Sequence, residues 1–195
     1  KHSAVNFNGR GGLSISSPNT AAHAELIQRC YREAGIDPRR VNYIEAQGMG
    51  TPVADIAEWE ACKRALSGLA EERGLRLSPD SCRISTLKPF CGHMHSASAL
   101  GALFKIIASL QNDTLYGIHG FAGLHPDLDE AGQVCRPALG QEHWERGQTA
   151  RLAGLHSYGS GGNNAHLLIE EYRTITSNLD DSGRCVIPLS ARSPA

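Results

Sequence analysis

The sequence has little net charge and no long run of apolar residues. Its 19 basic and 20 acidic residues leave a formal net charge of -1, which gives no general attraction to nucleic acid or to an anionic membrane. The longest apolar-rich segment, residues 100–110, is interrupted by Lys105, whereas a bilayer span needs about 20 apolar residues. Residues 1–10 contain no signal-peptide core. We therefore expect a cytoplasmic protein that binds neither nucleic acid nor a membrane.

The six cysteines show no pairing or metal-binding pattern. Their spacings are irregular and no CxxC occurs, so a disulfide framework is not expected in a chain of 195 residues. Hydrophobic residues make up 41% of the chain and charged residues 20%, which is typical of a folded domain with a buried core. We expect reduced thiols, in keeping with a cytoplasmic location.

The first third of the chain alternates strand and helix patterns. A strand is expected over residues 3–8 and a helix over 21–34, with Thr20 as its N-cap and Gly35 just beyond its end. A buried strand over 41–46 then leads through a glycine turn to a second helix. That helix spans residues 52–69, and Thr51 can cap it before Pro52 in its first turn.

The rest of the chain continues this alternation. Residues 67–82 are expected to form a polar surface excursion, and residues 119–149 a covering loop. The small residues of a helix over 96–112 predict that it is packed tightly and buried rather than amphipathic. Short strands are expected at 83–87, 114–118, 151–159 and 165–172, the last two joined by a glycine-rich turn. This order indicates a layered α/β domain.

Three segments carry candidate chemistry, and each has a competing interpretation. The segment GMGTPVA at 48–54 resembles a dinucleotide loop but lacks the acidic residue that should follow the next strand; a tight turn without a ligand is the alternative. Cys82, Cys91, His93 and His95 could be zinc ligands, but their spacing matches no common site, so we expect no metal. A histidine at this loop–helix junction otherwise suits acid/base or electrophilic chemistry, or a hydrogen bond within the loop.

The third segment is the glycine-rich turn within residues 156–166. A strand follows it, so it lacks the helix N-terminus that a phosphate loop requires. It could instead line a buried tunnel with backbone. His166, at the start of an apolar strand, is expected to be a core histidine with its hydrogen bonds satisfied.

Together these segments resemble the C-terminal half of β-ketoacyl synthases, in particular the ketosynthase domains of modular polyketide synthases. The segment at 41–58, VNYIEAQGMGTPVADIAE, is similar to the family's strand followed by EAHGTGT and xxGDxxE. The segment at 85–107, STLKPFCGHMHSASALGALFKII, is similar to its K-x4-GH segment and the following helix. The segment at 154–171, GLHSYGSGGNNAHLLIEE, is similar to GxSSFGxxGTNAHxxxEE. The likeness covers residues 1–172.

The resemblance implies a thiolase-like fold, of which this chain would be the C-terminal half, and a homodimer of complete domains. It implies acyl transfer from an acyl carrier protein to a cysteine in the N-terminal half, on the same or a separate chain. No cofactor would be bound directly, because the carrier protein presents 4′-phosphopantetheine. Residues 173–195 resemble the start of the linker that follows such domains.

The family's site residues carry over unevenly. His93 falls on its second catalytic histidine, Lys88 on the lysine five residues earlier, and Thr51 on a threonine that contacts the pantetheine arm. Gln47 stands in place of the first histidine and Met49 in place of the first threonine. Two further residues, Tyr158 (more often Phe in the family) and Gly159, would border the substrate tunnel.

Glutamine cannot exchange a proton near neutral pH. The resemblance therefore implies a non-elongating ketosynthase, which holds or transfers an acyl chain without decarboxylative condensation. An active condensing enzyme, with His95 or His156 replacing the lost histidine, is an alternative. A separate half-domain that pairs with a cysteine-bearing partner chain is another, because the sequence begins with a strand pattern already under way.

Overall fold

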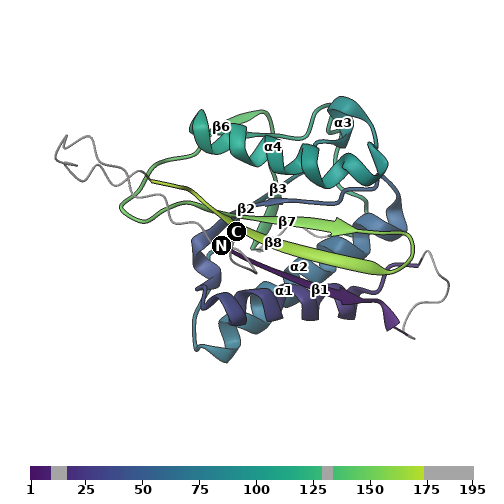
Figure 1. The fold of residues 1–195 in the computed structure, drawn as a ribbon, viewed down its shortest axis with the longest axis horizontal. Helices are drawn as coiled ribbons and strands as arrows, with labels where there is room; N and C mark the ends of the chain where they lie inside the picture. The colour runs from purple at the N-terminus through teal and green to yellow at the C-terminus, as the bar shows by residue number, and fades with distance from the viewer. Residues whose placement is uncertain (10–16, 129–133, 174–195) are drawn as a thin grey trace, which may run out of the picture.

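The chain forms three layers, with helices on both faces of a central sheet (Figure 1). The computed structural model describes residues 1–9, 17–128 and 134–173. Helices α1 (Thr20–Ala34) and α2 (Pro52–Glu72) cover one face, and α4 (Ser98–Gln111) covers the other. This is the layered α/β arrangement that the sequence predicts.

Six strands make up the central sheet, in the order β1-β8-β7-β2-β3-β5. Their bounds are β1 His2–Phe7, β2 Val41–Glu45, β3 Cys82–Ser85, β5 Cys135–Pro137, β7 Leu152–Tyr158 and β8 Asn163–Glu170. The pairs β1–β8 and β8–β7 are antiparallel, whereas β7, β2, β3 and β5 run parallel to one another. The carboxyl ends of β2, β3 and β7 therefore meet at one edge of the sheet, where ligands commonly bind in α/β folds.

Helices α1 and α2 differ from prediction at their ends. Asn19, not Thr20, caps α1: its Oδ1 accepts the backbone N–H groups of Ala21 and Ala22 at 3.1 Å each. Gly35 ends α1 at φ 65°, as predicted. Helix α2 runs to Glu72, so the predicted surface excursion begins later, because the side chains of its last turns are still buried in the core.

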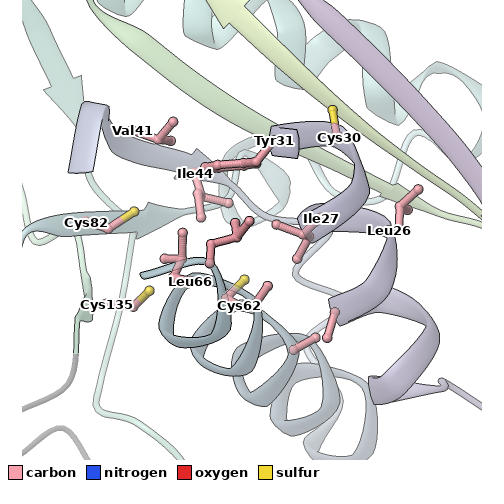
Figure 2. Packing of buried hydrophobic residues seen from close by; sticks show 14 of the residues in the cluster. Leu26, Ile27, Cys30, Tyr31, Val41, Ile44, Cys62, Leu66, Cys82 and Cys135 are labelled. Atoms are coloured by element: carbon pink, nitrogen blue, oxygen red, sulfur yellow. The ribbon is translucent and has the colours of Figure 1, made fainter. Parts of the chain in front are cut away.

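The main core lies between this helical layer and the sheet (Figure 2). Its members include the buried residues Leu26, Ile27, Tyr31, Ile44 and Leu66 and the thiols of Cys30, Cys62, Cys82 and Cys135. These cysteines act as small apolar side chains. All five described cysteines are free, and Cys91 is the exposed one among them; Cys185 lies outside the described residues.

Helix α4 packs a second, smaller core against the opposite face of the sheet. Ala102 and Ile106 face Tyr43, Leu115 and Trp144 there. The prediction of a fully buried helix is wrong, because one side of α4 is open. The exposed apolar residues on this side are Leu100 (58%), Phe104 (66%) and Ile107 (37%). The three define what we call the α4 apolar face.

The described part of the predicted covering loop, residues 119–128 and 134–149, contains two strands. Strand β5 joins the main sheet, and β6 (Gln141–His143) pairs with β4 (Thr114–Tyr116). Short elements complete the fold: the 3-10 turns η2 (Pro38–Arg40) and η3 (His95–Ala97), and α3 (Lys88–Cys91). The predicted linker from residue 174 onward lies outside the described residues. Within the described chain, no helix has the length and apolarity to cross a membrane.

Candidate active site

The turn that follows β2 is held by one buried carboxylate. Glu58 of α2 accepts the backbone N–H of Gln47 at 2.8 Å through Oε1 and that of Gly48 at 2.9 Å through Oε2. Gly48 has φ 50°, and a Cβ there would lie 2.6 Å from the Thr86 hydroxyl. No side chain fits at that position, so glycine and carboxylate together set the path of the backbone.

Glu58 also contacts a histidine from the sheet. His156 of β7 places Nδ1 at 2.7 Å from Glu58 Oε1, and both side chains are buried. Burial raises the pKa of Glu58, but the hydrogen bonds from His156 and from the two turn amides outweigh it. The net effect is a pKa below the usual value, so Glu58 is an ionised carboxylate at neutral pH.

His93 is presented by the loop between α3 and α4. Its Nδ1 accepts the backbone N–H of His95 at 2.9 Å, and Ser98 Oγ lies 3.3 Å from the same atom. Positive φ angles at Gly92 (72°) and His95 (49°) allow this return of the backbone. In a neutral imidazole the proton must then sit on Nε2, so His93 offers a hydrogen-bond donor from that atom.

Six of the seven predicted site residues line one cavity of about 500 Å³. They are Gln47, Met49, Thr51, His93, Tyr158 and Gly159. They come from the turn between β2 and α2, from the loop between α3 and α4, and from the end of β7, at the edge of the sheet where the parallel strands end. Segments far apart in the sequence thus converge on one space.

Lys88, the seventh, borders a neighbouring cavity of about 530 Å³. The two cavities share Met49, Glu58 and His93 in their walls. The Lys88 ammonium donates a hydrogen bond to the carbonyl oxygen of Gln47. Burial lowers the pKa of Lys88, an effect that the nearby carboxylates oppose. Lys88 therefore holds the carbonyl group of Gln47, whereas Glu58 holds its N–H group.

Thr51 and Met49 occupy the turn itself. Thr51 stands at the N-cap of α2, as predicted, although its side chain makes no capping hydrogen bond. Its exposed hydroxyl borders the cavity. Met49 places Sδ 3.5 Å from Gln47 Nε2, and this contact orients the Gln47 amide.

A stack of rings beneath the cavity escaped the sequence analysis. Tyr158 stacks on His23 of α1, with centroids 3.9 Å apart and planes at 14°. His156 lies 5.3 Å from Tyr158 and 4.9 Å from His166, its direct partner in the β7–β8 register. The sequence predicts that these two strands are joined by a turn, but the register that pairs the two histidines comes from the structure. His23, however, comes from a distant helix, and no local pattern marks it.

His166 is buried as expected, but its hydrogen bonds are not satisfied. Neither ring nitrogen has a partner among the described residues. Burial lowers the pKa of His166 well below its ordinary value, helped by the nearby His156. It is therefore a neutral core side chain. The prediction that it is satisfied is wrong.

The zinc interpretation also fails on geometry. Cys82 is buried in the main core, whereas Cys91 and His93 are exposed. In residues 1–9, 17–128 and 134–173, no three His, Cys, Asp or Glu side chains are placed to hold a metal ion.

Comparison with known proteins identifies the family to which the chain belongs. Residues 1–122 match the family model described as β-ketoacyl synthase, C-terminal domain. The chain belongs to the β-ketoacyl synthase family. This β-ketoacyl synthase chain is 34% identical over 203 residues to polyketide synthase PksR of Bacillus subtilis (strain 168), which covers 99% of the chain. It is 36% identical over 178 residues, 88% of the chain, to polyketide synthase ThaG of Burkholderia thailandensis.

Solved ketosynthases share the fold. The ketosynthase from module 6 of the bacillaene synthase from B. subtilis 168 superimposes with a TM-score of 0.82, at 25% identity. That match covers 89% of this chain and 30% of the other. The oxazolomycin ketosynthase domain OzmH KS7 from Streptomyces albus JA3453 gives 0.79 at 28% identity, over 88% and 30%. These matches confirm the predicted thiolase-like fold.

The β-ketoacyl synthase chain covers only part of each relative. It spans 8% of PksR and 3% of ThaG. The activity, substrates and partners of the complete protein are therefore matters for proposal.

Proposed function

We propose that this chain is the C-terminal part of a ketosynthase domain in a polyketide synthase, and that the complete domain is non-elongating. It would receive an acyl chain from an acyl carrier protein, hold it or pass it on, and not extend it. The observation that carries this proposal is Gln47, whose side chain lines the same cavity as His93. The family motif has a histidine at that position.

The two side chains differ in what they can do. His93 can donate from Nε2 to an acyl carbonyl, and imidazole can also exchange a proton near neutral pH. The Gln47 amide can donate a hydrogen bond but cannot gain or lose a proton in this range. Losing one such donor or acid/base group lowers a rate by about 10²- to 10⁴-fold. Acyl transfer to a cysteine depends less on this position, because the thiolate itself is the nucleophile.

The remaining site residues suit a pantetheine thioester. Thr51 and Gly159 offer a hydroxyl group and backbone at the cavity wall, while Met49 and Tyr158 supply apolar surface there. We propose that the carrier protein presents its 4′-phosphopantetheine arm to this wall. The proposed partners are the carrier protein, the N-terminal ketosynthase half and a second complete domain. We further propose that residues 1–172 belong to the ketosynthase domain and residues 173–195 to a linker.

The test compares the complete domain with its Gln47→His variant. Wild type is expected to gain the mass of an acyl group from an acyl carrier protein, seen by intact-protein mass spectrometry. It should release no CO₂ from malonyl carrier protein above a no-enzyme blank. Gln47→His is expected to raise CO₂ release by at least about tenfold, since it restores an acid/base group. Wild type that already releases CO₂ and extends the chain would overturn the proposal.

His93→Ala provides the matched control on the other side of the cavity. It should abolish the CO₂ release gained by Gln47→His if both side chains serve one reaction. CO₂ release that persists in the Gln47→His, His93→Ala double variant would show that His93 takes no part in the reaction, and would contradict the proposed site.

An active condensing enzyme is the second candidate, and one observation favours it. His95 lines the same cavity, with its ring 5.3 Å from that of His93. His156 does not line the cavity and is bonded to Glu58. If wild type releases CO₂, loss of that release in His95→Ala would identify His95 as the replacement.

A role in assembly is the third candidate, and the α4 apolar face favours it. Leu100, Phe104 and Ile107 are exposed side by side on one helix. A separate chain carrying the cysteine half would cover such a face. Co-purification of that chain with this one, as a stable pair at equal stoichiometry, would support this reading over a single continuous domain.

A further inference from the structure

His156 is a titratable side chain next to the site, at a position where the family motif has a serine. It stands where the motif GxSSFG has its first serine. It lies beneath the same turn in which glutamine has replaced a histidine. Its imidazole is 1% exposed and does not border either cavity, so it cannot touch a substrate there.

Its hydrogen bond explains what it can do instead. An ionised Glu58 can only accept, so the proton of the 2.7 Å contact belongs to His156 Nδ1. The same carboxylate oxygen accepts the backbone N–H of Gln47. Whatever the state of Nε2, Nδ1 is therefore a donor that fixes the Glu58 carboxylate, and Glu58 in turn fixes the backbone that carries Gln47.

Packing holds the ring in this orientation. Tyr158 lies on one side of it and His166 is 4.9 Å away across the β7–β8 pair. A buried carboxylate that loses a hydrogen-bond donor is destabilised far more than an exposed one. The free energy that keeps Glu58 charged and in place is thus supplied in part by His156.

We propose that His156 is a positioning residue for acyl transfer: through Glu58 it sets where the Gln47–Thr51 turn lies relative to His93. This inference rests on the proposed function for its link to acyl transfer. A serine hydroxyl is one bond from Cβ, whereas imidazole Nδ1 is two bonds away, so a serine at position 156 would not reach Glu58 with the geometry seen here. The contact that holds the carboxylate in this chain therefore depends on the histidine.

The experiment uses the complete domain with His156→Leu and His156→Asn. Leucine fills the volume without a donor, whereas asparagine places its Nδ2 where imidazole has Nδ1. Amide hydrogen exchange is followed at Gln47 and Gly48, whose N–H groups are held by Glu58. Exchange is expected to be at least about tenfold faster in His156→Leu and within about threefold of wild type in His156→Asn.

The acylation rate from an acyl-pantetheine thioester is measured in the same proteins. His156→Leu should lower kcat/KM by about 10- to 100-fold, the scale expected of a misplacement of about 1 Å. His156→Asn should recover most of the loss, and His143→Ala, an exposed histidine on β6, should match wild type. Asparagine that performs no better than leucine in both measurements would overturn the proposal.

The two readouts separate this inference from the proposed function. If wild type takes up no acyl group, the proposed function fails, and hydrogen exchange alone still decides whether His156 holds the turn. If wild type is acylated but His156→Leu exchanges and reacts as wild type does, the positioning role fails and the proposed function stands.

Discussion

Tyr158 carries a hydroxyl group that the described fold does not use. The oxygen is buried and has no hydrogen-bond partner among the described residues, while the ring packs between His23 and His156. Burial raises the pKa of Tyr158 well above its usual value, helped by the nearby Glu58. A buried polar group without a partner destabilises the folded state by about 1–3 kcal/mol.

Tyr158→Phe is therefore expected to keep or raise the stability of this chain. The free energy of unfolding, measured by urea denaturation, should not fall and should rise by up to about 2 kcal/mol. Tyr31→Phe is a matched control, because its buried hydroxyl also lacks a partner in the described part. A loss of more than about 1 kcal/mol in Tyr158→Phe would mean that the hydroxyl has an unrecognised partner.

His23 makes the stability of the protein depend on pH. Burial lowers its pKa to about 4, opposed by Glu58 and assisted by His156. The unfolded chain titrates near 6.5, so between pH 6.5 and pH 4 it binds more protons than the folded state. Stability is then complete above pH 6.5 and falls with pH, by about 3 kcal/mol at pH 4 from this residue.

The measurement compares wild type with His23→Gln at several pH values between 7 and 4. Acidic groups contribute equally to both proteins, so the difference between their unfolding free energies isolates His23. That difference should shift in favour of the variant as the pH falls. Parallel curves would show that His23 titrates normally in the folded protein.

The residues at the cavity wall were predictable because they lie in contiguous motifs. Gln47, Met49, Thr51 and His93 sit within two such segments, and each motif implies a turn at a strand end. His23 was missed because it lies on α1 and reaches the site only through tertiary packing, which leaves no local sequence pattern. The α1 cap was misplaced by one residue because Asn19 and Thr20 are both good cap residues and only the backbone conformation separates them.

At the scale of elements, α4 is tied to the sheet by a buried ion pair. Lys105, which interrupts the apolar run in the sequence, places Nζ 3.0 Å from Glu45 Oε2 and 2.6 Å from Ser85 Oγ. Tyr43 donates its hydroxyl proton to the same carboxylate. Burial raises the pKa of Glu45 and lowers that of Lys105, while their mutual attraction opposes both shifts.

Removing one partner of this ion pair should lower the free energy of unfolding more than removing both. Lys105→Met is expected to lower the free energy of unfolding by about 3–5 kcal/mol, because it leaves the Glu45 charge buried without its cation. Glu45→Gln combined with Lys105→Met should recover more than half of that loss. Calorimetry on the four proteins of this cycle measures the coupling, and additive losses would contradict a buried ion pair.

Helix α4 and strands β5 and β6 were mispredicted because tertiary packing, rather than local sequence, determines their environment. The small residues of α4 indicate close packing, and they do pack on the sheet, but sequence alone cannot say what covers the opposite side. Strands β5 and β6 contain three residues each, too few to show alternation. Their conformation comes from pairing with β3 and β4, which is a tertiary effect.

At the scale of the molecule, the α4 apolar face should drive self-association of this 195-residue chain. Apolar groups that stay in water on one helix are a typical contact surface. Sedimentation velocity is expected to show species larger than a monomer, and Leu100→Glu with Phe104→Glu should shift them to monomer. Leu139→Glu is the control, since Leu139 is 54% exposed and does not belong to the α4 apolar face. A monomeric wild type would contradict the role of this face.

At Gly48, the path of the turn after β2 is fixed independently of the neighbouring side chains. The backbone there is anchored by Glu58 and closed off by Thr86, and neither contact involves the side chains at 47 or 49. If positions 47, 48 and 49 are randomised and folded variants are selected, position 48 should thus remain glycine, whereas positions 47 and 49 should accept many residues. The side chain at position 47 can therefore change during evolution, from imidazole to amide, while the backbone of the turn keeps its conformation.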